Sequence, residues 1–164
     1  MPEDQIFMGI DPGKNGALVT VDVNEQIMYE KCFDCQDTIE GNARLLKKIL
    51  SDIDPGTRAL AALEKVNAMP KQGVRSVWNF AENFAMWKTL LTAFQVPFEL
   101  VTPQTWMKGL VKPSDHPVKK KRGLTVCRRK YPGNGFFKLE KHDGRADATL
   151  MAVHLKRKIY RYSP

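Results

Sequence analysis

Three strand patterns separated only by short turns open the chain and restrict how its first quarter can fold. Residues 5–10 are mostly apolar and end at Asp11, and a glycine-containing turn over 12–16 leads into a second pattern over 17–23. A short turn at Asn24-Glu25 leads into a third pattern over 26–32. Because short links join antiparallel neighbours, these three strands are predicted to form one antiparallel unit.

Helix and strand patterns alternate over the rest of the chain. The run 58–63 is apolar on both faces, as a buried parallel strand is. Another strand is predicted over 96–101, and helices are predicted over 38–53, 74–94, 103–110, 118–131 and 143–159. This order predicts an α/β fold with a mixed central sheet of about five strands and helices on both faces. At 164 residues, the chain is expected to form one domain over 1–164.

Positive charge is concentrated in the second half of the chain. The net charge is +8, and the segment from Lys112 to Lys130 holds eight basic residues against the single acid Asp115, which makes +7 of that total. Such a segment is often just a solvated helix face. A field this concentrated favours a polyanionic partner, and nucleic acid is the best match.

The chain ends and the cysteines narrow the class of protein further. No apolar run is long enough to cross a bilayer, and the N-terminus carries acids where a signal peptide carries bases, so a cytoplasmic protein without a membrane partner is expected. Cys32 and Cys35 have the spacing of a zinc knuckle or a dithiol. With no second pair to complete four ligands, two reduced thiols are the preferred interpretation.

Four acids lie at the ends of predicted elements. Asp11 and Glu64 each end a strand, and Asp143 and Asp147 are four residues apart on one helix face. Taken singly, the acids have structural explanations: Asp11 as a turn residue, and Glu64 as a partner of Lys65 or a solvated strand end. The dipole of a helix favours acids in its first turn, and Asp143 can be its cap. Brought together they would repel unless protonated or neutralised by cations, and Mg²⁺ prefers such oxygen ligands. Within a basic chain, this pattern predicts a metal-dependent enzyme acting on nucleic acid.

Motifs spread along the whole chain resemble those of a known family. They are Gly9-Ile10-Asp11-Pro12-Gly13-x-x-Gly16-Ala17, Leu63-Glu64-Lys65-Val66, Met69-Pro70-Lys71-Gln72-Gly73-Val74, Val101-Thr102-Pro103-Gln104-Thr105-Trp106 and Asp143-Gly144-Arg145-Ala146-Asp147-Ala148. In this order, they resemble the motifs of RuvC-type Holliday junction resolvases, in the compact phage-borne branch of the ribonuclease-H-like superfamily.

The resemblance implies a ribonuclease-H-like fold, a homodimer, and two Mg²⁺ or Mn²⁺ ions per active site, with no nucleotide cofactor. The implied activity is the resolution of four-way and branched DNA by paired nicks. By this resemblance, Asp11 bridges the metals, and Glu64 and Asp147 are direct ligands. Asp143 occupies a position where relatives carry Asp or His, so the adjacent His142 is the alternative ligand.

The same resemblance extends to DNA contacts. It implies that Lys108 binds a phosphate and that further cations hold the DNA backbone; these are Lys119, Lys120, Lys121, Arg122 and Arg129. The chain departs from bacterial members at Asn67, where they place an aromatic residue that helps open the junction, and Met69 is a possible substitute. The helix over 74–94 is the expected dimer interface.

Three other functions remain open on the sequence. An actin- or hexokinase-like phosphotransferase shares Asp-x-Gly-x-x-Gly between two strands, but normally needs two such domains. A non-catalytic nucleic-acid-binding module would use its acids structurally. A broader ribonuclease-H-like nuclease would share the site and differ in substrate. Replacing Asp11 with Asn separates the catalytic from the non-catalytic cases.

Overall fold

The computed structural model describes residues 4–65, 67 and 71–161. Strands β1 (Gln5–Asp11), β2 (Ala17–Val21) and β3 (Ile27–Asp34) form an antiparallel unit, as predicted. Strands β4 (Arg58–Glu64) and β5 (Phe98–Val101) extend the sheet in parallel on the other side of β1. The sheet order is β3-β2-β1-β4-β5, which confirms the predicted mixed five-stranded α/β fold.

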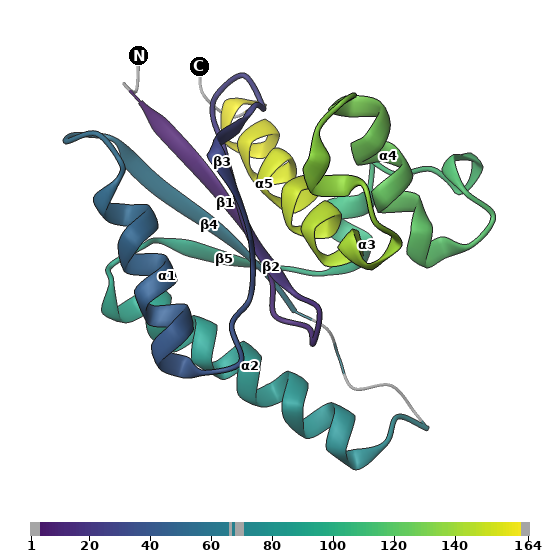
Figure 1. Cartoon of the computed structure of the whole chain (residues 1–164), viewed down its shortest axis with the longest axis horizontal. Helices are drawn as coiled ribbons and strands as arrows, with labels where there is room; N and C mark the ends of the chain where they lie inside the picture. The colour runs from purple at the N-terminus through teal and green to yellow at the C-terminus, as the bar shows by residue number, and fades with distance from the viewer. Residues whose placement is uncertain (1–3, 66, 68–70, 162–164) are drawn as a thin grey trace.

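Helices cover both faces of this sheet (Figure 1). On one face, α5 (Asp143–Arg161) lies along the strands with α3 (Pro103–Met107) and α4 (Arg122–Lys130) beside it. The core on that face is formed by Phe7, Ala62, Trp106, Leu124 and Leu150, among others. On the other face, α1 (Ile39–Ser51) and α2 (Val74–Ala93) bury a second core that includes Met8, Leu46, Leu63, Trp87 and Leu91.

The register of the strands brings two predicted site residues to one edge of the sheet. Ile10 pairs with Leu63 between the parallel strands β1 and β4, and Asp11 and Glu64 each follow by one position. Alternate residues of a strand point to the same face. Phe7 and Ala62 belong to the core under α5, so Asp11 and Glu64 project on the α5 side of the sheet.

A close approach of backbones fixes α5 against β1. A Cβ atom added to Gly9 would lie only 1.7 Å from the carbonyl oxygen of Ala148. Only glycine leaves room for two backbones at this distance. The Gly9 contact therefore holds the N-terminal half of α5, with its acids, over the end of β1.

Several predicted boundaries differ from the structure. The second strand ends at Val21 instead of residue 23, because Asp22 Oδ1 accepts hydrogen bonds from the backbone N–H groups of Asn24 and Gln26, both at 2.8 Å, and so turns the chain. The helix predicted over 103–110 ends at Met107. In place of one helix over 118–131, a 3₁₀ turn over Lys119–Lys121 leads into α4.

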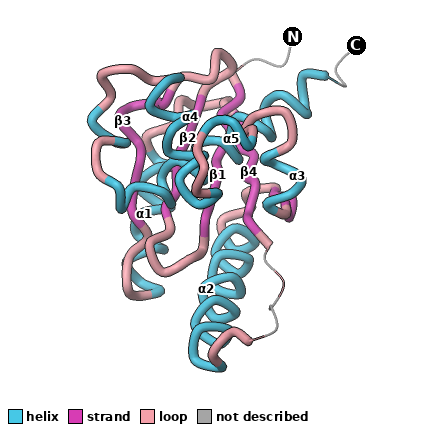
Figure 2. Tube along the Cα trace, turned by 90° about the vertical axis from the view of Figure 1, so that its right-hand side faces the viewer, coloured by secondary structure: helices cyan, strands magenta, loops and turns pink. Residues whose placement is uncertain are grey.

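The N-terminal part of α2 extends beyond the sheet (Figures 1 and 2). Val74 and Trp78 on this part are 84% and 66% exposed. Asn67 is also exposed, whereas Met69 lies outside the described residues. In the described part of the chain, no helix has the length and apolarity needed to cross a membrane.

Candidate active site

The structure brings the four predicted acids to the same end of the sheet. Asp11 and Glu64 come from the ends of β1 and β4, and Asp143 and Asp147 come from the first turns of α5. Gly144 packs against Asp11: a Cβ added there would lie 3.3 Å from Asp11 Oδ2 and 2.0 Å from the carbonyl oxygen of Asn15. The lack of a side chain at Gly144 thus allows the start of α5 to approach the turn after β1.

Asp11 is held by the turn that follows it. Its Oδ1 accepts a hydrogen bond from the backbone N–H of Gly13 at 2.8 Å, and the Cys35 thiol lies 3.6 Å from its backbone oxygen. Burial raises the pKa of Asp11 to about 6, and the nearby Asp143 adds to this, whereas the Gly13 bond and Lys120 oppose it. Asp11 is therefore both the turn residue and a member of the acidic group.

Glu64 is buried, with only 8% of its surface exposed. Its Oε1 accepts a hydrogen bond from the indole Nε1 of Trp106 at 2.9 Å. Burial and the nearby charge of Asp11 raise the pKa of Glu64 to about 7, although the Trp106 bond acts in the opposite direction. The alternative pairing of Glu64 with Lys65 is not needed to explain its position.

Asp147 and Asp143 complete the group. Burial raises the pKa of Asp147 well above its usual range, and the charges of Asp11, Glu64 and Asp143 act in the same direction. Gly123 of α4 leaves room for Asp147, since a Cβ there would lie 2.5 Å from Asp147 Oδ1. On Asp143, Oδ2 lies 3.2 Å from the ammonium of Lys120.

His142, the alternative to Asp143, is turned elsewhere. It is buried, and its Nδ1 accepts a hydrogen bond from the backbone N–H of Leu139 at 3.3 Å. Burial and the neighbouring Arg145 lower its pKa, while Asp34 opposes them. The charges that act on Asp11 and Asp147 are those of the other acids and Lys120. The geometry therefore favours Asp143 over His142 as the fourth member of the group.

The donor chemistry of this group fits a hard divalent cation. All four members offer carboxylate oxygens, three have raised pKa values because they are buried near like charges, and a cation would relieve that repulsion. Within residues 4–65, 67 and 71–161, no three acidic, histidine or cysteine side chains already converge at metal-binding distances. The site thus supplies ligands of the right type without a closed coordination shell.

The predicted DNA-contacting cations differ in their surroundings, and Lys120 is the one that pairs with an acid of the group within the described residues. Lys119, Lys120 and Lys121 occupy the exposed 3₁₀ turn beside Asp143, and Lys121 pairs with Glu140 at 3.2 Å. Lys108 is exposed at the end of α3. By contrast, Arg122 Nε donates to the backbone oxygen of His116, and Arg129 pairs with Asp115 at 3.0 Å.

Lys130 of α4 belongs to a separate cluster of charges. Its ammonium binds Glu25 at 2.6 Å, together with Arg157 at 2.7 Å and Lys156 at 3.5 Å. Glu25 is buried and lies in the turn between β2 and β3. This cluster ties that turn to α4 and α5, so these cations serve the fold.

The two cysteines with C-x-x-C spacing point to opposite faces of the sheet. Cys32 packs in the core under α5, and Cys35 packs against the core under α1 and α2. Burial raises the pKa of both thiols to about 12. This placement agrees with two reduced thiols, the preferred interpretation of the sequence.

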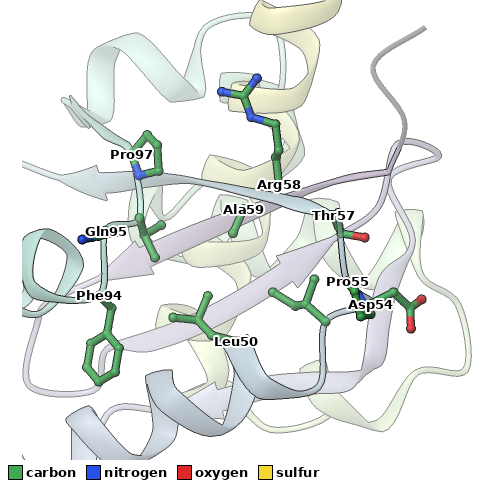
Figure 3. A pocket seen from close by; sticks show the side chains of 12 residues that line it. Leu50, Asp54, Pro55, Thr57, Arg58, Ala59, Phe94, Gln95 and Pro97 are labelled. Carbon is green, nitrogen blue, oxygen red and sulfur yellow. The ribbon is translucent and has the colours of Figure 1, made fainter.

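A surface hollow elsewhere contains none of the four acids. It measures about 460 Å³ and lies between the C-terminal ends of α1 and α2 and the start of β4, lined by Leu50, Phe94 and Pro97 among others (Figure 3). Because β4 runs from this hollow to Glu64, the hollow and the acidic group lie at opposite ends of the strand.

Sequence reasoning gave no role to three residues that shape the site. Trp106 contacts Glu64, Gly123 makes room for Asp147, and Gly144 makes room for Asp11. The signals were local: a tryptophan four positions after a helix-capping threonine, and glycines in the first turns of two helices. None of these signals identifies its partner, which is distant in sequence.

Comparisons with known proteins give a likeness of structure. No protein-family model and no curated protein matches the sequence. The solved structure of T. thermophilus RuvC in complex with a Holliday junction substrate matches this chain with a TM-score of 0.63 and 13% sequence identity, over 96% of each chain. At this identity the likeness concerns the fold. The chain has a ribonuclease-H-like α/β fold, as RuvC does.

Proposed function

We propose that this protein is a metal-dependent endonuclease that resolves Holliday junctions and other branched DNA by paired nicks. The carrying observation is the meeting of Asp11, Glu64, Asp143 and Asp147 at one end of the sheet, where burial and mutual repulsion raise the pKa of three of them. The structural likeness to RuvC supports the assignment through the fold.

The four carboxylates would hold Mg²⁺ or Mn²⁺, as two ions per site. When bound, such ions supply an activated water and stabilise the leaving 3′ oxygen of a phosphodiester. The carboxylates would position the ions, and their partly buried location reduces the screening of these charges by bulk water. Lys108 and the turn Lys119–Lys121 would bind phosphates of the DNA backbone, which gives affinity without sequence readout.

The exposed part of α2 supports a homodimer. Val74 and Trp78 present apolar surface on a segment that lies beyond the sheet, and contiguous exposed apolar surface marks interaction sites. A second copy of the chain would cover it and give two active sites for two nicks. Analytical ultracentrifugation should find a dimer, and Trp78→Ser should shift it toward monomer. A monomeric wild-type protein at working concentration argues against paired nicking by a stable dimer.

Cleavage assays with matched substrates test the proposed activity. A mobile four-way junction should be cut in Mg²⁺ faster than a fork, a duplex or an RNA–DNA hybrid of the same sequence, and not in EDTA. Asp11→Asn should abolish cutting and keep junction binding. Equal cutting of plain duplex, or cutting in EDTA, overturns the resolvase assignment, and preferential cutting of the hybrid supports a ribonuclease H instead. Unchanged behaviour of Asp11→Asn would favour a non-catalytic binding module.

A further inference from the structure

Trp106 makes a buried hydrogen bond to one oxygen of Glu64. The distance from its Nε1 to Glu64 Oε1 is 2.9 Å, and the two residues are 2% and 8% exposed. A buried carboxylate is costly unless hydrogen-bonded, and an indole N–H in a core seeks an acceptor. The bond therefore fixes the orientation of the carboxylate through Oε1 and leaves Oε2 without this restraint, available as a metal ligand.

The short helix α3 places this indole next to Glu64. Its Pro103 stands at the first turn, and the Thr102 hydroxyl accepts from the backbone N–H of Thr105 at 3.4 Å as the cap. Five residues are too few for a stable helix in water. The burial of Trp106 in the core with α5 supplies the missing stabilisation.

The donor and the acceptor are anchored to the same pair of strands. The backbone N–H of Lys65 donates to the carbonyl of Val101 at 2.8 Å, which joins the residue after Glu64 to the end of β5. Helix α3 begins two residues beyond Val101. Because Glu64 ends β4 and α3 follows closely after the neighbouring strand β5, the pairing of these strands brings Trp106 near Glu64.

A second buried tryptophan shows that burial alone does not create such a bond. Trp87 is fully buried on the opposite face of the sheet. Its Nε1 lies near the Cys35 thiol but makes no hydrogen bond of ordinary geometry within the described part of the chain. Trp87 is thus a control: a buried indole whose N–H donates to none of the four acids in the described part of the chain.

We propose that Trp106 is a positioning residue, whose indole N–H orients the Glu64 carboxylate for metal binding. This proposal rests on the proposed function. An unrestrained glutamate would lose rotamer freedom when it binds a cation, and a preset one has already lost it. Outer partners that orient metal ligands are typically worth about 10–100-fold in metal affinity or activity.

Mn²⁺ binding by the DNA-free protein, followed by electron paramagnetic resonance, tests the proposal directly. Trp106→Phe removes the N–H and keeps most of the ring, so it should weaken Mn²⁺ binding by about 10–100-fold. It should also lower kcat on a four-way junction while junction affinity in EDTA stays unchanged. Trp87→Phe should match the wild type in both assays.

Glu64→Gln in the same titration tests the metal site separately from the positioning role of Trp106. If the wild type and Glu64→Gln bind Mn²⁺ equally, the metal site of the proposed function fails. If Glu64→Gln weakens binding while Trp106→Phe binds like Trp87→Phe, the metal site stands and the positioning role of Trp106 is overturned.

Indole N–H signals in the wild-type protein provide a test that does not require Trp106→Phe to fold. The chain has three tryptophans, so three such signals are expected. Titration with Mg²⁺, which is diamagnetic, should shift the Trp106 signal and leave the Trp87 signal in place. An unmoved Trp106 signal at saturating Mg²⁺ contradicts the coupling between this indole and the bound Glu64.

Discussion

Arg145 forms a bidentate ion pair with Asp34: Nε donates to Oδ1 at 2.7 Å, and Nη2 donates to Oδ2 at 2.6 Å. The pair joins the end of β3 to the first turn of α5, two residues from Asp143 and from Asp147. Bidentate pairs of this kind restrict orientation as well as adding energy. The pair therefore helps to hold the acidic end of α5 against the sheet.

Loss of this pair should lower stability modestly. Because Asp34 is more than half exposed, Arg145→Lys should cost roughly 1 kcal/mol or less in the free energy of unfolding. Urea unfolding at pH 7 measures the change. Arg145 lowers the pKa of Asp34, so the difference between wild type and variant should disappear as the pH falls below the folded pKa of Asp34. A difference that persists in acid contradicts the ionic origin.

Because of the acidic group, we expect the free energy of unfolding in EDTA to fall as the pH rises. The folded pKa values of Asp11 and Glu64, about 6 and about 7, exceed the usual 3.8 and 4.5. The unfolded chain therefore releases these protons first, and the folded state loses stability between about pH 4 and 7. Asp147→Asn should raise the melting temperature at pH 8 in EDTA by several degrees, for a gain of about 1–2 kcal/mol.

Mg²⁺ should reverse that effect in the wild type. A ligand that binds only the folded state stabilises it by mass action, about 2.7 kcal/mol at 100 times its Kd. Thermal unfolding at pH 8 should show a Mg²⁺-dependent rise for the wild type and a smaller one for Asp147→Asn. Equal rises in both proteins would indicate that the cation binds elsewhere.

Gly123→Ala should separate stability from activity. Alanine favours a helix over glycine by about 1 kcal/mol, so α4 should not be weakened. The added Cβ, however, would lie 2.5 Å from Asp147 Oδ1 and must displace that carboxylate. We expect near-normal unfolding together with an activity loss of about tenfold or more. Gly135→Ala is the control, because a Cβ there meets no atom within 4 Å.

The salt dependence of junction binding should owe more to the exposed Lys119 than to the ion-paired Arg129. Removing a phosphate-contacting lysine reduces the slope of log K against log salt by about 1. Lys119→Ala should do so, whereas Arg129→Ala should change the slope less, because Asp115 neutralises Arg129. Binding that is insensitive to salt would refute the backbone-contact proposal.

Glu25→Gln should destabilise the protein without direct effect on the acidic group. It would leave Lys130, Lys156 and Arg157 without their shared partner, at a cost of roughly 2–3 kcal/mol. Hydrogen bonds from Arg157 and Lys130 lower the pKa of Glu25 from 4.5 to about 2 and outweigh its burial. This stability is therefore present above about pH 4.5 and lost as the pH falls toward 2. An equal effect of the substitution at pH 7 and at pH 2 would contradict this account.

The sequence by itself determined the order and type of the elements. Apolar runs of period two, short turns and helical stripes are local signals, and they predicted the antiparallel β1–β3 unit, the parallel β4 and the helices on both faces. Asp11 and Glu64 could be placed at one edge because each ends a strand. The acids of α5 could be placed on one helix face because they are four residues apart.

Only the tertiary structure decided what each site residue contacts. His142 and Asp143 are adjacent in the chain, yet the turn before α5 directs Asp143 toward Lys120 and His142 toward Leu139. The bond between Trp106 and Glu64 joins residues 42 positions apart in the sequence. Lys130 and Arg157 are more than 100 positions from Glu25, to which they bind. Such contacts depend on how the helices pack across the sheet. Local periodicity in the sequence contains no information about which residues this packing brings together.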